Sequence, residues 1–388
     1  MKKFLKFPLC LIGGAMMVAG IAACSDDEPV ETASTDKETM FKNAMAPYVN
    51  NTVIPAYKGM ADNAILMSDA CNDIFNAFVS GTLTTDMVRT AGGHWNLCRD
   101  YWEKSEAFLY GAAADYNIDP HIDSWPLDKN AMDDQLAELR AGKNWTIDNN
   151  AGYGLLGFHA VEYMLFELSA DGNSSLPHNI NYTREELIYL CTVAEDLRNQ
   201  CIRLEAAWAG IDNVSSRKQQ ILADAELEPS FNYGWSMINA GQPRSLYTTY
   251  QEAAETLIQG CIDIADEVGN TKIGRPANAA TEDDKNYIES PYSLNSIVDF
   301  EGNIISIRNS YQGSNEGDAS ISDYIKTVDP ALDTRVKQQI QASIDAIKAI
   351  PEPFAKSASG AAADKAVTVV GTDLVNVLEE VMSALSKY

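Results

Sequence analysis

The chain has 388 residues, of which 55 are acidic and 29 are lysine or arginine, and its formal net charge is −26. This balance argues against nucleic acid as a partner, because a phosphate backbone is bound by a basic surface. A strongly acidic surface attracts cations and also keeps a protein soluble, so the charge alone does not choose between these roles. The length suggests two domains rather than one.

The N-terminus has the features of a targeting segment. Three lysines precede an apolar run over residues 7–19, which is too short to span a membrane. Residues 21–24 read IAAC, and small residues directly before Cys24 resemble the lipobox of bacterial lipoproteins, in which the cysteine is lipidated. We therefore expect a lipoprotein signal peptide over residues 1–23 and a lipid on Cys24. An ordinary signal peptide that contains a cysteine is the alternative.

The residues after the lipobox predict the destination of the protein. The acidic run SDDE at 25–28 resembles the signal that sends Bacteroidetes lipoproteins to the outer face of the outer membrane. Apart from that resemblance, an acidic tether stays solvated and flexible. We expect an acidic tether over residues 24–36 and an outer-membrane lipoprotein at the cell surface, with a periplasm-facing protein as the alternative.

Apolar residues recur at intervals of three and four through most of the mature chain, and no convincing alternating strand pattern is found. We therefore expect an all-α protein. Thr35 with Glu38 resembles a capping box that opens the first helix. Pro47 and Pro55 are expected to kink or divide the early part of that helix, and Gly111 to end the next one. The predicted helices cover about 35–78, 84–111, 131–141, 150–168, 183–209, 245–268, 293–311, 319–328, 331–350 and 362–387, with a doubtful one near 215–225.

Five cysteines follow the lipobox, and none form a CxxC pair. An exported protein permits disulfides, but these residues fall within helical apolar patterns. We expect all five to be small core residues. They are Cys71, Cys98, Cys191, Cys201 and Cys261.

Residues 210–243 are rich in Gly, Pro, Ser and Asn, and this composition suggests a domain boundary. The segments on either side resemble each other, because AYKGMADNAILMSDACNDI at 56–74 and TYQEAAETLIQGCIDIADE at 249–267 share helix length and apolar phase. The helices after them end in EAFLYG and RNSYQG. We expect two four-helix bundles related by an internal pseudo-repeat, one over 37–212 and one over 213–388.

The run GFHAVEY at 157–163 places two ionisable side chains in an apolar helix. His159 and Glu162 are three residues apart and therefore share one helix face. Gly157 lowers the helix propensity by about 1 kcal/mol relative to alanine, which suggests that another backbone or side chain approaches closely. A buried carboxylate must find a cation, a donor or a proton. The spacing fits either a His–Glu hydrogen bond in the core or half of a metal site.

Known zinc-protease helices do not match this run. HExxH supplies two histidines one turn apart, and the inverted HxxEH pattern has a histidine where this chain has Tyr163. The other histidines are His94, His121 and His178, whereas carboxylates are plentiful. One imidazole among carboxylates suits iron better than zinc.

GFHAVEY resembles the G-x-H-x-x-E motif of the imelysin-like family. Other stretches resemble that family's recurrent blocks in the same order, from about residue 40 to the end: WEKSEAFLYGAA at 102–113, IDSWPLD at 122–128, EVGNTKIGRP at 267–276 and SPYSLNSIVDFEGNIISIRNSYQG at 290–313. The resemblance implies a two-bundle, all-helical lipoprotein or periplasmic protein. The family was classified as metallopeptidases, its motif was proposed to bind the metal, and its members include proteins linked to bacterial iron uptake.

The resemblance also implies site residues. His159 and Glu162 match the motif, Glu106 lies in the WEKSEAF block, and Asp123 lies in IDSWPLD. We expect these four side chains to converge on one metal. A salt bridge is the alternative for Glu106, and a turn is the alternative for Asp123. We expect four further residues to line the cleft between the bundles, namely Ser293, Asn295, Asp299 and Arg308. Arg308 is expected to face Glu106 across the pseudo-dyad. The alternative roles for these residues are capping and helix packing.

Together with these patterns, the family resemblance implies a surface lipoprotein that binds a divalent metal, iron rather than zinc, and is linked to iron uptake. Its expected partners are the metal ion, the membrane through the lipid on Cys24, and other components of an uptake system, but not nucleic acid. One alternative is a metallopeptidase that uses His159 and Glu162 with a bound metal, although no separate base is evident. The other is a non-catalytic binder of a peptide or glycan. No catalytic residue is assigned.

Overall fold

A computed structural model describes residues 31–147, 152–167 and 180–387, and within these ranges the chain forms helices and no strand. The prediction of an all-α protein is confirmed. The expected signal peptide, the lipidation site at Cys24 and the acidic run at 25–28 lie outside the described residues. Among the described helices, none has both the length and the apolar character needed to cross a membrane.

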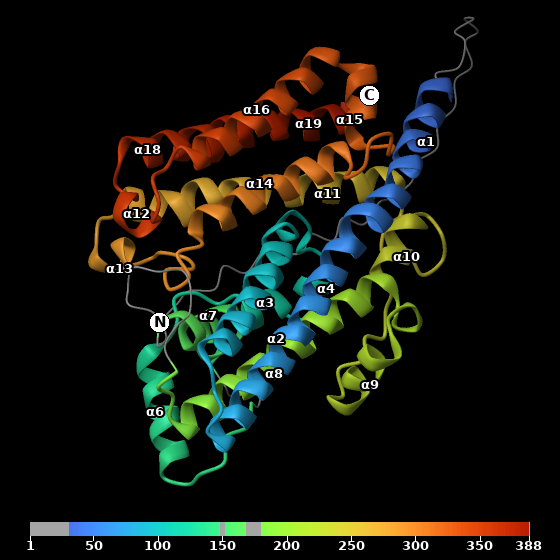
Figure 1. The fold of residues 1–388 in the computed structure, drawn as a ribbon. Coiled ribbons are helices and arrows are strands. Elements are labelled where there is room, and N and C mark those ends of the chain that lie inside the picture. The colour runs from blue at the N-terminus through green and yellow to red at the C-terminus, as the bar shows by residue number, and fades with distance from the viewer. Residues whose placement is uncertain (1–30, 148–151, 168–179, 388) are drawn as a thin grey trace, which may run out of the picture.

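The long helices form two groups that pack against each other (Figure 1). In the first group α2 packs against α3 and α8, and in the second group α14 and α19 pack against α11 while α16 packs against α14 and α19. The long helices are α1 (Glu31–Pro47), α2 (Ile54–Ser80), α3 (Thr85–Glu103), α8 (Arg184–Ala209), α11 (Tyr250–Asp266), α14 (Ser296–Gln312), α16 (Pro330–Lys348) and α19 (Val375–Lys387).

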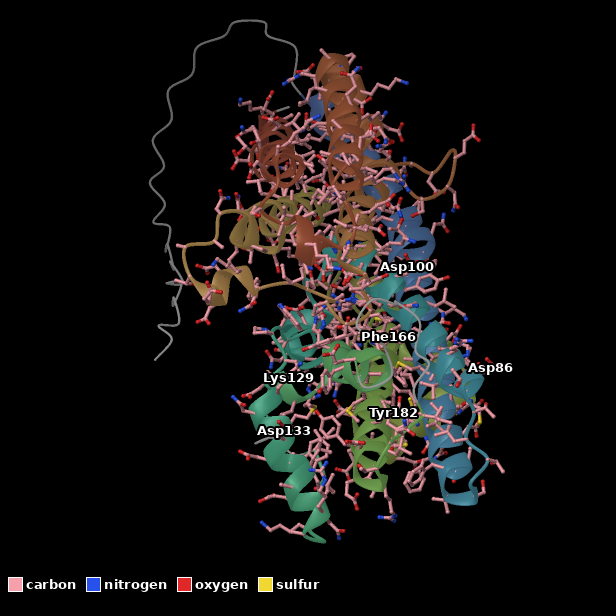
Figure 2. All side chains as sticks on the ribbon, turned by 60° about the vertical axis from the view of Figure 1, so that its left-hand side comes forward. Asp86, Asp100, Lys129, Asp133, Phe166 and Tyr182 are labelled. Carbon is pink, nitrogen blue, oxygen red and sulfur yellow. The ribbon has the colours of Figure 1, made fainter. Side chains whose placement is uncertain are left out.

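Shorter helices connect and cover the two groups. They are α4 (Ala112–Asp115), α5 (Ile118–Ile122), α6 (Lys129–Arg140), α7 (Gly157–Glu162), α9 (Ser216–Asp224), α10 (Tyr233–Ile238), α12 (Gly274–Ala277), α13 (Glu282–Lys285), α15 (Ile321–Val328), α17 (Phe354–Ser357) and α18 (Ala361–Thr368). Figure 2 shows Phe166 inside the first group, whereas Asp86 on α3 and Asp133 on α6 project outward.

Within the described ranges, four π-helical segments and three 3-10 turns lie within or between these helices. The π segments are η1 (Tyr48–Val53), η4 (Tyr163–Glu167), η6 (Glu267–Ile273) and η7 (Val369–Leu374), and the 3-10 turns are η2 (Glu106–Phe108), η3 (Tyr153–Leu155) and η5 (Ile211–Asn213). The segments η6 and η7 cross at two glycines, because a Cβ on Gly269 would lie 2.2 Å from the Cα of Gly371. A side chain at Gly269 would therefore separate the two segments, whereas a Cβ on Gly371 would meet the side chain of Asn270 at 2.9 Å.

The expected division at residue 212 and the pseudo-repeat stay predictions. The first helix, α1, packs against α11 and α15 of the second group, while α10 packs against α8 of the first group. Helices from each side of the expected boundary thus reach across it. Four of the five cysteines are buried core residues as predicted, whereas Cys191 is half-buried and packs against the core.

The structure corrects the predicted start of the first helix and the end of the second. Helix α1 begins at Glu31, so Thr35 lies within it. The Glu38 carboxylate accepts hydrogen bonds from the backbone N–H groups of Tyr250 (3.1 Å) and Gln251 (3.3 Å), at the start of α11. It therefore satisfies the free N–H groups of a distant helix rather than those of its own. The π segment η1 interrupts the α-helical pattern near the two prolines, between α1 and α2, while the flanking backbone stays helical.

The predicted helix over 84–111 is too long, because α3 ends at Glu103. The Ser105 hydroxyl donates to the carbonyl of Trp102 at 2.7 Å, and the side chain of Asn303 on α14 donates to the carbonyl of Glu103 at 3.2 Å. These bonds satisfy carbonyls that the helix end leaves free. The short helices α4, α5 and α10 were not predicted, since four to six residues are too few to show a helical period.

The helix over 183–209 is confirmed, with a capping box at Thr183. The motif helix begins later than predicted, at Gly157, whose φ is +74°. A Cβ at this glycine would lie 2.0 Å from the carbonyl oxygen of Ile122. The close backbone approach that the sequence suggested is therefore present, and it sets the motif helix directly against the end of α5.

Replacing Gly157 with alanine is expected to destabilise the fold by roughly 2–4 kcal/mol, because the change combines overpacking with a left-handed backbone. Gly93→Ala is the matched control, since Gly93 lies in α3 with no atom near its missing Cβ, and alanine there should add about 0.5–1 kcal/mol. Urea unfolding of both variants checks this. Equal effects of the two substitutions would contradict the close approach.

Candidate functional site

The motif helix buries its ionisable pair. His159 is 1% exposed and Glu162 is 0% exposed, and the imidazole Nδ1 lies 3.1 Å from Glu162 Oε2. The other oxygen, Oε1, accepts hydrogen bonds from the backbone N–H groups of Tyr292 (3.1 Å) and Ser293 (2.8 Å) and from the Ser293 hydroxyl (2.7 Å). Both oxygens of Glu162 are thus engaged, and this carboxylate orients the imidazole.

The opposite ring nitrogen of His159 faces Asp123. Nε2 lies 3.2 Å from Asp123 Oδ1, at ion-pair distance but without a hydrogen bond of good geometry. Asp123 Oδ2 accepts a hydrogen bond from the Trp102 indole N–H at 2.7 Å, and Oδ1 also contacts the Arg99 guanidinium. The loop after α5 therefore brings Asp123 between α3 and the motif helix.

Arg99 lies at the centre of the buried charges and is 0% exposed. Besides Asp123, its guanidinium pairs with the carboxylates of Glu103 (2.5 Å), Glu289 (2.8 Å) and Asp299 (3.4 Å). These partners come from α3, from the segment before α14 and from α14 itself. One cation therefore ties the first helix group to the second.

Lys272 supplies a second buried cation from the π segment η6. Its ammonium lies 2.9 Å from Glu106, 3.2 Å from Glu289 and 3.8 Å from Glu103. All of these side chains are at most 8% exposed. Single-turn π segments are frequent at functional sites, and this one sets the ammonium among the carboxylates.

Negative charge is in excess in this network, where three cationic groups face six carboxylates. The cationic groups are Arg99, His159 and Lys272, and the carboxylates are Glu103, Glu106, Asp123, Glu162, Glu289 and Asp299. Burial disfavours ionised groups and raises the pKa values of Glu103 and Glu106 well above the ordinary value, and that of Asp299 to about 6. The network therefore holds protons or an additional cation.

In the facing pair Asp123 and His159, the pKa shifts favour the charged form of both groups, in contrast to Glu103, Glu106 and Asp299. Burial alone would raise the pKa of Asp123, but Arg99 and His159 outweigh it and hold this pKa well below the ordinary value. Burial would lower the pKa of His159, but its contacts with Asp123 and Glu162 outweigh it and raise the pKa to about 9. In the metal-free protein at neutral pH, His159 is therefore an imidazolium between two carboxylates.

The donor geometry fits a metal ion. Asp123, His159 and Glu289 each offer a donor atom, and these atoms lie within 4.8 Å of one another. Nε2 of His159 and Oε2 of Glu289 are buried atoms without a hydrogen-bond partner. The Glu162 bond to Nδ1 has the form of the carboxylate–histidine–metal arrangement that leaves the other nitrogen for the metal. Glu103, Glu106 and Asp123 form a second such group.

The expected site residues are brought together in part. Glu106, Asp123, His159 and Glu162 belong to one buried network, but Glu162 is held by Ser293 and Glu106 is paired with Lys272, so the four do not form one coordination set. Asn295 donates to Asp299 at 2.5 Å within the network. Arg308 donates to Asn309 beside it, and Lys272 rather than Arg308 faces Glu106.

Sequence reasoning missed four members of the network, namely Arg99, Glu103, Lys272 and Glu289. Glu103 and Lys272 stand within the blocks WEKSEAFLYGAA and EVGNTKIGRP, and Glu289 directly precedes SPYSL. Position within a block was therefore an available signal for Glu103 and Lys272, and adjacency to a block for Glu289. Arg99 lies outside the blocks, three residues before WEKSEAF, and carries no such signal.

Removal of the central cation is expected to destabilise the fold strongly. Arg99→Met leaves buried carboxylates without their partner and should cost about 3–5 kcal/mol. Arg217→Met is the control, since Arg217 pairs with Asp69 at the surface, where an ion pair contributes about 1 kcal/mol or less. Denaturant unfolding measures both changes, and a cost at Arg99 no larger than at Arg217 would contradict the central role of its guanidinium.

The raised pKa of His159 makes the stability of the metal-free protein depend on pH. The folded value, about 9, lies above the ordinary value of about 6.5. The stabilisation is therefore fully present below about pH 6.5 and is lost as the pH rises through 9. We expect the stability difference between wild type and His159→Gln, measured by urea unfolding with a chelator present, to shrink over this interval. A stability difference that stays constant or grows between pH 6.5 and 9 would contradict the raised pKa of His159.

Known proteins resemble this chain over most of its length. The family model described as Imelysin, of the M75 peptidases, matches residues 54–384. The iron-regulated protein A of Synechococcus elongatus is 27% identical over 346 residues, which cover 88% of this chain and 83% of that protein.

Solved structures share the fold. One described as an iron-regulated protein A precursor from Parabacteroides distasonis superposes with a TM-score of 0.75 and 27% identity, over 90% of this chain and 96% of the other. An imelysin-like protein from Psychrobacter arcticum, with a TM-score of 0.56 and 13% identity over 90% and 94% of the two chains, shares the fold alone. Since the family model spans most of the sequence, this chain belongs to the imelysin family.

Proposed function

We propose that this protein binds a divalent metal through Asp123, His159 and Glu289, with Glu162 as the residue that orients His159. The observation that carries the proposal is the pair of buried donor atoms that make no hydrogen bond, His159 Nε2 and Glu289 Oε2, beside the Asp123 carboxylate, which lies 3.2 Å from Nε2 and has a low pKa. A buried polar atom without a partner is unfavourable, and a cation between these atoms would relieve that cost.

The donor set favours iron over zinc. Two carboxylates with one imidazole are hard, oxygen-rich ligands, and zinc sites are more often built from several histidines or cysteines. A divalent cation would also offset part of the excess negative charge of the network. Metal binding must displace the proton of His159, so the affinity should rise with pH.

The wider role that we propose is iron uptake at the outer membrane. Two relatives carry the name iron-regulated protein A, which supports a link to iron. The lipobox-like IAAC and the acidic SDDE support a lipoprotein anchored through Cys24 and displayed at the cell surface. Other components of an uptake system would then receive the metal from this protein.

The metallopeptidase alternative requires a polypeptide to reach the donors. The cavity that contacts Asp123 and Glu289 has a volume of about 100 Å³, room for about three water molecules. This volume is too small for a peptide bond with its flanking residues. The geometry therefore favours ion binding over proteolysis, and no described feature favours a peptide or glycan ligand.

Anaerobic calorimetric titration with Fe²⁺ tests the metal site. The wild type should bind with release of a proton, His159→Ala and Glu289→Gln should lose the site, and Glu162→Gln should weaken it by about 10–100-fold, as expected for an orienting carboxylate. His121→Ala is the matched control, because His121 also pairs with a carboxylate, that of Asp196 at 2.7 Å, outside the network.

Two results would count against the site. If His159→Ala bound Fe²⁺ as tightly as the wild type, the proposed donor set would be wrong. If Glu162→Gln abolished binding as completely as His159→Ala, Glu162 would be a ligand rather than an orienting residue. Circular dichroism of each variant is the control that checks whether the fold is retained.

A further inference from the structure

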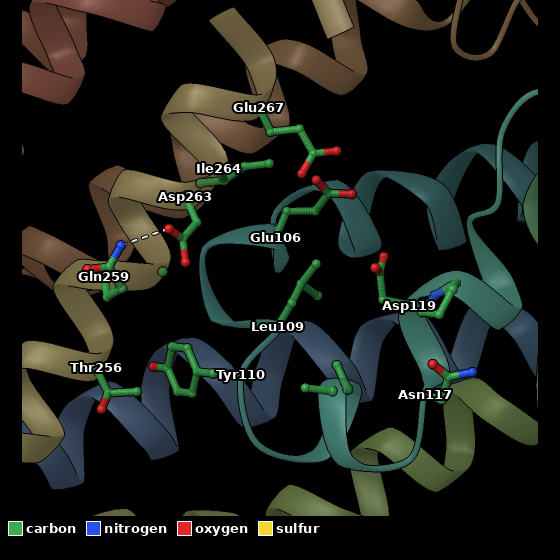
Figure 3. Close-up of a pocket in the computed structure, with 14 residues that line it drawn as sticks. Glu106, Leu109, Tyr110, Asn117, Asp119, Thr256, Gln259, Asp263, Ile264 and Glu267 are labelled. Atoms are coloured by element: carbon green, nitrogen blue, oxygen red, sulfur yellow. Dashed lines mark hydrogen bonds between the residues drawn. The ribbon is translucent and has the colours of Figure 1, made fainter. Parts of the chain in front are cut away.

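An acidic cavity opens beside the candidate metal site. It has a volume of about 490 Å³ and lies between α4, α5 and α11. Four carboxylates line it, those of Glu106, Asp119, Asp263 and Glu267, and none of its lining residues in the described chain is lysine or arginine. Figure 3 shows the carboxylates of Glu106, Asp119 and Glu267 directed toward the same space.

A smaller cavity, the inner cavity, adjoins this outer one. Its volume is about 100 Å³, and it shares the residues Glu106, Leu109, Asp119 and Glu267 with the outer cavity. We refer to these four shared residues as the neck. The inner cavity then reaches the donor residues Asp123 and Glu289, with Lys272 and Trp125 also in its wall.

An unpartnered buried atom marks the inner end of this route. Glu289 is 6% exposed, lines the inner cavity, and its Oε2 has no hydrogen-bond partner. The carboxylates of the neck alone would not define a ligand site, because acidic groups often gather without an ion. Together with this buried oxygen without a hydrogen bond, which belongs to a residue of the inner cavity wall, they indicate a path along which a cation gains ligands.

The two cavities differ in the number of water molecules that a cation inside them could keep. A water molecule occupies about 30 Å³, so a cation with six waters needs roughly 180 Å³ of water volume. The outer cavity accommodates this, and the inner cavity accommodates only about three waters. Carboxylates at the neck would replace the waters that are lost, which lowers the cost of partial dehydration.

We infer that the metal reaches Asp123, His159 and Glu289 through the neck as an aquated divalent cation, and that the protein does not accept the metal as an anionic chelate. This inference rests on the proposed metal-binding function. An anionic chelate is repelled by the carboxylates of the outer cavity, and its organic part exceeds the inner cavity. The cation is attracted by the same field.

Stopped-flow tryptophan fluorescence tests the route, since Trp125 lines the inner cavity and its ring lies 4.7 Å from that of His159. The neck variant Asp119→Asn/Glu267→Gln should bind Fe²⁺ with an association rate at least about tenfold lower at low ionic strength. The control variant Asp212→Asn/Glu228→Gln also removes two acidic charges, at exposed positions that line neither cavity, and should change the rate by less than about twofold.

A steric variant gives an independent measurement. Ala114 is exposed and lines the outer cavity, so Ala114→Trp should slow association by obstructing the entrance, whereas Ala114→Ser should not. Neither substitution changes charge or touches a donor residue. Slow association in the tryptophan variant and normal association in the serine variant support the route.

Supply of iron as its citrate complex tests the selection of the cation. The observed rate should follow the concentration of free Fe²⁺ and show no saturation with the complex. Saturable binding of the intact complex, or association rates in the neck and Ala114→Trp variants equal to that of the wild type, would overturn the inference. Those outcomes leave the metal site intact as long as His159→Ala abolishes binding, whereas Fe²⁺ binding by His159→Ala would overturn the proposed function itself.

Discussion

The pairing of one buried guanidinium with several carboxylates is the interaction on which the arrangement of this protein depends. Arg99 contacts acidic groups from its own helix, from the loop after α5 and from two places in the segment around the start of α14. Partners so far apart in the chain can meet only when both helix groups are in place. An ion pair of this kind adds little net stability over an apolar core, but it strongly disfavours any arrangement that leaves one charge unpaired.

Local departures from regular helix geometry place the charges. A left-handed glycine sets the motif helix against the Ile122 carbonyl, and α3 ends early, with Glu103 against Asn303 of α14. A π segment carries Lys272, which pairs with Glu106. Each departure has a local cost that the surrounding packing must offset. All three departures occur at the buried charge network. This indicates that the geometry of the site, and not regular helix formation, determines the backbone there.

The sequence allowed the helical class, most long helices and the His159–Glu162 pair to be predicted, because helical periodicity and the three-residue spacing are local properties. It did not reveal that Glu162 is held by Ser293, since 131 positions separate the two residues. Arg99 was missed for the same reason, as its role is defined by partners up to 200 positions away. The early end of α3 also depends on a side chain of α14. What could not be predicted is long-range pairing, which the periodicity of a single chain does not encode.

The π segment that carries Lys272 bears on how related sequences should be aligned. Each residue of a helix turns the chain by about 100°, so an alignment gap of a single position within residues 267–273 would swing the ammonium to a different face. A relative could then keep a lysine at that column and yet leave Glu106 and Glu289 without their cation. Along this stretch, the number of residues between Gly269, where η6 crosses η7, and Lys272 is as informative as the lysine itself.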